Sequence, residues 1–556
     1  MRMFVTESKG NLTFRGMMEA ERFFYGAELV GTRGIPGPGQ PPKPVELGEA
    51  LAADPRIAWI SITDNPGGNP MLPADWIAKA LKPRGKPLVI HLTCKDLNRN
   101  GLESAAWRCA AEGFDNVLAL TGDYPAAGHQ GRAMPVFDLD SVGLIAMLRA
   151  MNGGLEVSRS NGKPRRLPPT NFFIGCAVSP FKQQERELMP QLFKLARKIE
   201  CGAQWVIPQL GYDMRKFHEI RLFLDWAQIK APVIGNVYVL NKTVADLFNK
   251  NKIPGCVVSD ALCALAGKYS SGLDKGRSFF MELAAKQLAV FKGLGFAAGY
   301  LGGLDKAESF ARIIDLAESY GPGDWKDFAR EIQFSKPGEF YLFEQNPQTG
   351  LGEPGQLNRE YLKSIQQPPR TGDVTLGWQF TRMIHWLAFT PGKRLFPALQ
   401  KVYGQLEKKD CRRTLKMLHR IEHASKAVLY QCQDCGDCSL PDTAYLCPRG
   451  SCSKNARNGP CGGSSDGRCE LGDKNCLWAR AYDRLKFYGQ SRHMLDRPAV
   501  FSNPALGGTS AWANNFLGRD HFHAAVPGDK TPPPDEAAPS ANIQELSRQP
   551  QAGKLS

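Results

Sequence analysis

The sequence lacks long hydrophobic runs, and nowhere does an apolar stretch approach the ~18 residues that a transmembrane helix needs. Its opening segment, MRMFVTESKGNLTFRG, contains no apolar signal-peptide core. These absences predict a cytoplasmic protein that has no membrane partner.

Localised basic patches are also missing. The formal net charge is +15, but the basic residues are spread along the chain and do not alternate with aromatics as in an RNA-binding signature. We therefore expect no nucleic-acid partner. A dispersed positive field favours small polyanions or an acidic protein instead.

A disulfide framework is not expected either, because the chain has an odd number of cysteines, 15, and no export signal. Cys411 is isolated, and eight others crowd into positions 432–476. Six are scattered through the first 300 residues, mostly in apolar runs, and are predicted to be small buried hydrophobes: Cys94, Cys109, Cys176, Cys201, Cys256 and Cys263.

A regular alternation of short β-rich runs and longer amphipathic segments occupies the first 305 residues of the 556. Helical patterns, for example 184–203 and 277–295, separate the runs. Eight strands are predicted, at 23–30, 57–63, 87–93, 116–122, 172–178, 205–210, 232–240 and 296–303. Strands that alternate with helices indicate a parallel sheet.

Eight such units in this length favour an α/β fold of the (β/α)₈ TIM-barrel type. A doubly wound sheet is the alternative, but it usually has fewer strands. Active sites of such barrels lie at the carboxyl ends of the strands. Polar residues and one glycine are predicted there: Glu28, Thr63, His91, Thr93, Thr121, Gly122, Asp123, Ser179 and Gln209.

These strand ends resemble the methylenetetrahydrofolate reductase family. The matching segments are VIHLTCKDLNRNGLES (89–104), NVLALTGDYP (116–125) and LFKLARKIECGAQWVIPQLGYD (192–213), within a resemblance that spans about residues 20–305. It implies a flavoprotein of one-carbon metabolism and methionine biosynthesis. Such an enzyme interconverts 5,10-methylenetetrahydrofolate and 5-methyltetrahydrofolate by hydride transfer through flavin.

The resemblance also implies roles for individual residues. Glu28 matches the general acid that opens the imidazolidine ring of the folate, Asp123 matches the aspartate beside the flavin and pterin, and Gln209 matches the pterin-binding glutamine. The cofactor is expected to be FAD or FMN, and the folate can be polyglutamylated. Flavin contacts are expected at Thr63, His91, Thr121, Gly122, Asp123, Arg197 and Lys198.

The chain departs from the family pattern at two places. The strand-one tail reads AELVGTRGIPGPG (27–39) and keeps only the glutamate, and Lys242 stands where NAD(P)H-using members carry a stacking Phe. The electron donor is therefore either NAD(P)H or a ferredoxin-like protein. A homo-oligomer is expected.

The eight clustered cysteines form two sets of four. Cys432, Cys435 and Cys438 are spaced C-x₂-C-x₂-C, and Cys447 precedes a proline. This spacing favours a [4Fe–4S] cluster over zinc, although the gap before Cys447 is longer than in ferredoxins. The other four have no standard spacing and bind a second centre or are buried spectators: Cys452, Cys461, Cys469 and Cys476.

The segment resembles the cysteine-rich C-terminal domain of some methylenetetrahydrofolate reductases, on CQDCGDC, AYLCP, RNGPCGGS and CLWARAYDRL. Two other functions stay open: a folate-dependent barrel methyltransferase without flavin, and a zinc-organised adaptor with an inactive barrel. The predicted organisation is a barrel (1–320), an irregular arm (321–378), a helical and cysteine-rich metal-binding domain (379–525) and a disordered tail (526–556).

Overall fold

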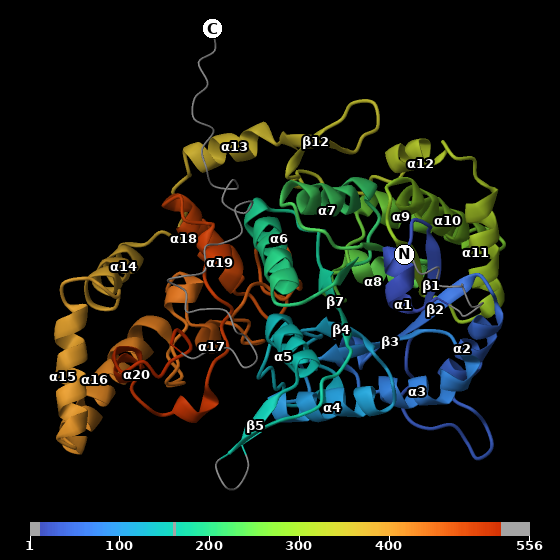
Figure 1. Cartoon of the computed structure of the whole chain (residues 1–556). Helices are drawn as coiled ribbons and strands as arrows, with labels where there is room; N and C mark the ends of the chain where they lie inside the picture. Colours follow the sequence, from blue (N-terminus) through green and yellow to red (C-terminus); the bar gives the residue numbers. More distant parts are fainter. Residues whose placement is uncertain (1–11, 159–162, 524–556) are drawn as a thin grey trace, which may run out of the picture.

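A computed structural model describes residues 12–158 and 163–523; the predicted tail therefore lies outside the described residues. Eight parallel strands form its centre (Figure 1). They are β1 (Phe24–Leu29), β2 (Ile57–Ile62), β3 (Leu88–Thr93), β4 (Asn116–Leu120), β7 (Phe173–Val178), β8 (Trp205–Pro208), β9 (Ile234–Tyr238) and β10 (Ala298–Gly302).

The sheet closes on itself. Its strand order is β8-β7-β4-β3-β2-β1-β10-β9, and a parallel bridge between Val206 and Val233 joins β8 to the segment that enters β9. The eight predicted strands and the predicted barrel are confirmed, and the doubly wound alternative is wrong.

Aromatic side chains fill the barrel interior near the amino-terminal ends of the strands. The short helix α1 (Phe14–Glu19) covers the amino-terminal ends of the strands, and the Phe14 ring lies edge-on to Trp59 and Trp205, with ring centroids 5.0 Å and 5.3 Å apart. Because strand residues alternate between the two faces of a sheet, the polar positions further along the same strands also face the interior.

Two glycines make room for these indole rings. A Cβ atom at Gly26 would lie 2.1 Å from the Trp59 ring, and one at Gly175 would lie 2.2 Å from the Trp205 ring. Since neither distance is compatible with a side chain, the strands require glycine at these positions.

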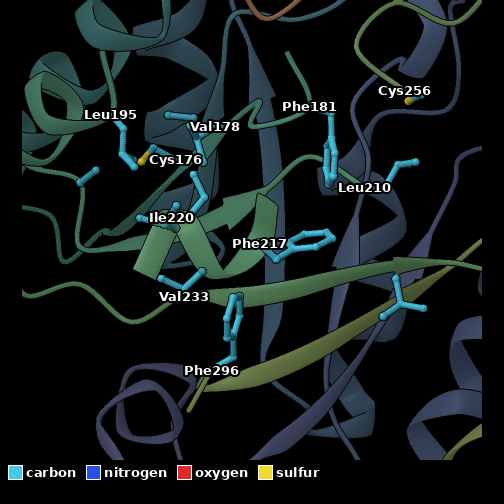
Figure 2. Close-up of a cluster of buried hydrophobic side chains, with 14 of the residues drawn as sticks. Cys176, Val178, Phe181, Leu195, Leu210, Phe217, Ile220, Val233, Cys256 and Phe296 are labelled. Carbon is cyan, nitrogen blue, oxygen red and sulfur yellow. The ribbon is translucent and has the colours of Figure 1, made fainter. Parts of the chain in front are cut away.

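Helices surround the barrel (Figure 1). Figure 2 shows part of the apolar layer between strands and helices, where Cys176 and Phe217 are among the side chains that fill it. Cys94, Cys109, Cys176 and Cys256 are buried, as predicted, whereas Cys201 and Cys263 are only partly buried. The helices are α2 (Lys43–Ala53), α3 (Ala74–Leu81), α4 (Arg99–Ala111), α5 (Ser141–Gly153), α6 (Glu185–Glu200), α7 (Met214–Trp226), α8 (Lys242–Asn249), α9 (Asp260–Ser270), α10 (Arg277–Gly293) and α11 (Ala307–Ser319).

Regular structure also occurs where the sequence predicts an irregular arm. Glu219 on α7 accepts hydrogen bonds from the backbone nitrogens of Leu342 (3.0 Å) and Phe343 (2.9 Å), so the arm is anchored to the barrel. The sequence of the arm is rich in Pro and Gly, which indicates irregular structure and gives no sign of this contact. The arm contains α12 (Trp325–Glu331), β11 (Phe343–Gln345), β12 (Gly352–Leu357) and α13 (Arg359–Gln366). A separate hairpin of β5 (Glu156–Ser158) and β6 (Pro164–Arg166) precedes β7.

The C-terminal part is helical and cysteine-rich and packs against α6 (Figure 1). Tyr482 donates a hydrogen bond to Glu185 over 2.6 Å, and Arg186 pairs with Asp483 at 3.2 Å. No helix within the described residues is long and apolar enough to cross a membrane. The helices are α14 (Leu376–Ala388), α15 (Phe396–Lys408), α16 (Arg412–Tyr430), α17 (Pro448–Ser451), α18 (Leu477–Phe487), α19 (His493–Asp496) and α20 (Ala511–Phe516).

Candidate active site

Glu28 lies at the carboxyl end of β1 and is half-buried. The Tyr300 hydroxyl donates a hydrogen bond to its Oε1 at 3.1 Å. Gly302 leaves space for the carboxyl group, because a Cβ atom there would lie 2.4 Å from Glu28 Oε2. Burial raises the pKa of Glu28 to about 7, against the opposing effect of the Tyr300 hydrogen bond. A side chain with this pKa can both hold and release a proton near neutrality.

His91 lies on β3, which is separated from β1 by β2. Its Nε2 atom lies 2.7 Å from the hydroxyl of Ser61, which pairs in register with Glu28 on the adjacent strand. Burial lowers the pKa of His91 to about 4, so the imidazole is neutral at pH 7. It can accept or donate a hydrogen bond without carrying charge.

The turn after β4 brings together Thr121, Gly122 and Asp123. The Thr121 hydroxyl lies 3.2 Å from that of Ser141. Gly122 has a φ of +90°, and a Cβ atom there would lie 3.0 Å from Thr93 Cβ, so this backbone favours glycine. Asp123 Oδ2 accepts a hydrogen bond from the backbone nitrogen of Gly67 at 2.8 Å, which fixes the carboxylate relative to the loop after β2.

Two further strand-end residues are placed by backbone contacts. Thr63 is buried, and its hydroxyl donates to the carbonyl of Leu29 over 3.3 Å. Gln209 follows β8, and its Oε1 accepts from the backbone nitrogen of Leu210 at 3.0 Å. The amide group of Gln209 is thereby oriented, and its Nε2 has no hydrogen-bond acceptor among the residues that the structure describes.

Ser61, Asp64 and Tyr300 were not singled out from the sequence. Asp64 accepts from the Thr93 hydroxyl (2.7 Å) and backbone nitrogen (3.0 Å). Strand alternation was the available signal for Ser61 and Tyr300, because each lies two residues from an inward-facing position. Their contacts depend on which strands are neighbours, and the periodicity of one strand does not reveal its neighbours.

The pair predicted at the flavin phosphates, Arg197 and Lys198, is buried on α6. Arg197 donates to the carbonyl of Arg497 at 2.6 Å and Lys198 to that of Ala177 at 2.6 Å. Burial lowers the pKa of Lys198 to about 8. Neither head group is a solvated helix charge. Their contact with phosphate stays a prediction, and their present hydrogen bonds do not support it.

The strand-end residues have side chains of the chemical types that can bind a flavin. Thr63, His91 and Thr121 offer neutral donors and acceptors, and Gly122 leaves the backbone free of a side chain. Ser179 Oγ, at the end of β7, is buried and has no hydrogen-bond partner among the residues described. An unpaired buried hydroxyl of this kind can be satisfied by a bound polar ring system.

The first four clustered cysteines gather around the carboxyl end of α16. Burial raises the pKa of Cys432, Cys438 and Cys447, and thiols of the same set, Cys435 among them, raise it further. Lys426 Nζ lies 3.9 Å from Cys438 Sγ. Lys426 therefore places a cation beside one thiol of this set.

The second four gather separately, within the loops around α17 and the start of α18. Burial raises the pKa of Cys461 to about 12 and that of Cys476 to about 11. Cys452 raises both, and Cys469 raises the pKa of Cys452 and Cys476. The division of these cysteines into two metal-binding sets stays a prediction.

Grouping is not the same as metal geometry. Within residues 12–158 and 163–523, no group of three or more His, Cys, Asp or Glu side chains is arranged to hold a metal ion. The donor types, eight thiols, are those of a thiolate-bound centre. Metal binding by these cysteines stays a prediction.

The closed barrel with a polar site at its strand ends defines a TIM-barrel protein. Residues 44–268 match the family described as methylenetetrahydrofolate reductase, and residues 412–502 match the methylenetetrahydrofolate reductase C-terminal domain. The chain belongs to the methylenetetrahydrofolate reductase family, with both parts in one polypeptide.

Individual relatives are distant. Methylenetetrahydrofolate reductase 2 of Schizosaccharomyces pombe is 24% identical over 36% of this chain and 31% of its own length. Methylenetetrahydrofolate reductase (NADH) 1 of Arabidopsis thaliana is 23% identical over 46% of this chain and 41% of its own. The chain thus spans less than half the length of these curated relatives.

Among solved structures, an uncharacterized protein from Clostridium thermocellum that binds two copies of 5-methyl-5,6,7,8-tetrahydrofolic acid aligns with 55% of this chain and 96% of its own. The identity is 13% and the TM-score 0.38. A likeness this low supports no assignment of fold or ligand.

Proposed function

We propose that the protein is a flavin-dependent oxidoreductase that interconverts 5,10-methylenetetrahydrofolate and 5-methyltetrahydrofolate. Family membership supports the reaction class. The observation that carries the proposal is Glu28: its pKa is raised to about 7 by burial, and it lies at the carboxyl end of a barrel strand. A proton donor at this place is what the closed folate ring requires.

The chemistry begins with a proton transfer. The ring carbon of the closed aminal is a poor hydride acceptor. Protonation of a ring nitrogen by Glu28 Oε makes that nitrogen a leaving group and generates the electrophilic iminium. Reduced flavin, when bound, supplies the hydride. In the opposite direction, Glu28 takes the proton back as the ring closes.

Other residues would position the folate and stabilise the positive charge of the iminium. Asp123, fixed by Gly67, provides negative charge for the cationic iminium. Gln209 Nε2 can donate to the pterin, and neutral His91, held by Ser61, can hydrogen-bond without adding a second charge. These assignments rest on the matched positions and on the hydrogen bonds described above.

Absorption spectroscopy and metal analysis of anaerobically purified protein test the proposal. A flavin spectrum that bleaches on addition of 5-methyltetrahydrofolate supports it. Folate binding without flavin would instead support the methyltransferase, and zinc with neither ligand would support the adaptor. The cytoplasmic location, the homo-oligomeric state and the choice of NAD(P)H or a ferredoxin-like donor stay predictions.

A further inference from the structure

The loop that carries Cys461 lies against the carboxyl ends of the barrel strands. A Cβ atom at Gly462 would lie 3.4 Å from Ser179 Cβ, and one at Gly255 would lie 3.2 Å from the carbonyl oxygen of Gly462 and 3.4 Å from Gln209 Nε2. The C-terminal domain therefore borders the same strand ends as Gln209.

Two buried lysines of the barrel hold this loop. Lys182 Nζ donates to the carbonyls of Gly462 and Ser464, each at 2.5 Å, and Lys194 Nζ donates to that of Gly459 at 3.1 Å. Both side chains are almost fully buried. Burying an ammonium group is costly unless its donors are paired, so these contacts specify where the loop lies.

Lys454 forms the reciprocal contact, from the C-terminal domain into the barrel. Its Nζ donates to the carbonyl of Gly122 at 3.0 Å and pairs with Glu470 at 2.5 Å. The side chains of Lys454 and Glu470 are only 5% and 3% exposed. Asp123 lies within electrostatic reach of the same ammonium.

We propose that the loop carrying Cys461 forms one wall of the barrel's active site, and that Lys454 is a positioning residue for the turn of Gly122 and Asp123. Glu470, adjacent to Cys469, orients the ammonium. The orientation of Asp123 then depends on the folding of the cysteine-rich domain. The placement rests on geometry alone, whereas its catalytic consequence rests on the function proposed above.

The first test measures amide hydrogen exchange in the full-length protein. In Lys454→Met, peptides covering residues 119–126 should exchange about fivefold faster, as expected for the loss of one buried hydrogen bond. Lys474→Met is the matched control, because Lys474 is exposed in the same domain and the hydrogen bond described for its ammonium group goes to Ser453; it should leave these peptides unchanged. Unchanged exchange in a folded Lys454→Met protein would overturn the proposal.

A milder variant covers the case in which Lys454→Met does not fold. Glu470→Gln keeps an oxygen acceptor for Lys454 but removes the negative charge, so exchange at 119–126 should rise by a smaller factor. If Glu470→Gln, correctly folded, equals the parent protein there, Glu470 has no orienting role and the proposal fails.

The effect of Lys454 on catalysis is tested by separate measurements on the flavin and on folate turnover. In the flavin-bound protein, Lys454→Met should shift the flavin absorption maximum or midpoint potential and raise the KM for 5-methyltetrahydrofolate about tenfold, with a smaller change in kcat. If the parent protein binds neither flavin nor folate, the proposed function fails while the exchange result still decides the placement of Lys454. A parent-like spectrum, potential and KM in the variant would overturn the positioning role.

Discussion

The Tyr300 hydroxyl donates a hydrogen bond to Glu28 Oε1 over 3.1 Å and joins two adjacent strands of the barrel. The hydrogen bond and burial act in opposite directions on the pKa of Glu28, and burial has the larger effect. The carboxyl group is held in one orientation and still titrates near neutrality.

Replacement of this acid should separate flavin chemistry from folate chemistry. Glu28→Gln keeps an acceptor for Tyr300 but cannot deliver a proton, so flavin should bind and be reduced while folate turnover falls at least ~100-fold. Glu46→Gln, an exposed glutamate on α2, is the control. Turnover within about tenfold of the parent, roughly 1.4 kcal/mol of barrier, would show that Glu28 is not the acid.

Stability should depend on pH through the same residue. Because the pKa of Glu28 is raised from 4.5 to about 7 in the folded protein, the folded state binds more protons than the unfolded state between these values. Its contribution to stability is therefore present below pH 4.5 and is lost as pH rises through about 7. At pH 8, Glu28→Gln should raise the free energy of unfolding by about 1–3 kcal/mol, measured by urea denaturation. The difference between variant and parent should shrink towards pH 5; a constant difference would contradict the shift.

Lys242 tests the identity of the electron donor. It begins α8, after β9, and forms an ion pair with Asp246. If it occupies the nicotinamide-stacking position, the parent should oxidise NADH slowly and Lys242→Phe should do so faster, without a change in folate affinity. Stopped-flow measurement of flavin reduction distinguishes the cases. Rapid NADH oxidation by the parent would remove the reason to favour a ferredoxin-like donor.

Cys435 tests the nature of the first cysteine set. With a [4Fe–4S] cluster, Cys435→Ser should remove broad visible absorption and slow reduction by a one-electron donor, while pre-reduced flavin still reacts with folate. With structural zinc, the variant should lose zinc and destabilise the C-terminal domain without loss of colour. Cys411→Ser, outside both sets, should change neither. Zinc without iron in anaerobically prepared parent protein would contradict the cluster.

The packing of the barrel interior should be intolerant of a single methyl group. Gly175→Ala places a Cβ atom against the Trp205 ring and should lower the free energy of unfolding by about 1–3 kcal/mol. Gly37→Ala is the control, because nothing lies within 4 Å of a Cβ atom there. Urea denaturation of both variants measures the effect; equal stabilities would show that Trp205 moves freely.

Local sequence patterns were sufficient to predict the barrel. Each of the eight strands is a short β-rich run bounded by turns, and buried parallel strands produce this pattern regardless of their neighbours. The arm at 321–378 is predicted to be irregular because much of it is rich in Pro and Gly. The hairpin of β11 and β12 is stabilised by Glu219, more than a hundred residues away in sequence. Such a distant contact cannot be predicted from a local sequence pattern.

The positions of the polar residues at strand ends follow from the local sequence pattern, which marks where each strand ends. The environments of these residues depend instead on packing between distant segments. The proton affinity of Glu28 depends on burial and on Tyr300, and the guanidinium of Arg197 is paired with a carbonyl of the domain packed over α6. Lys454 reaches Gly122 across a separation of 332 residues. Electrostatic energies depend on distance and on exclusion of water, and both are set by segments that meet only when the chain has folded.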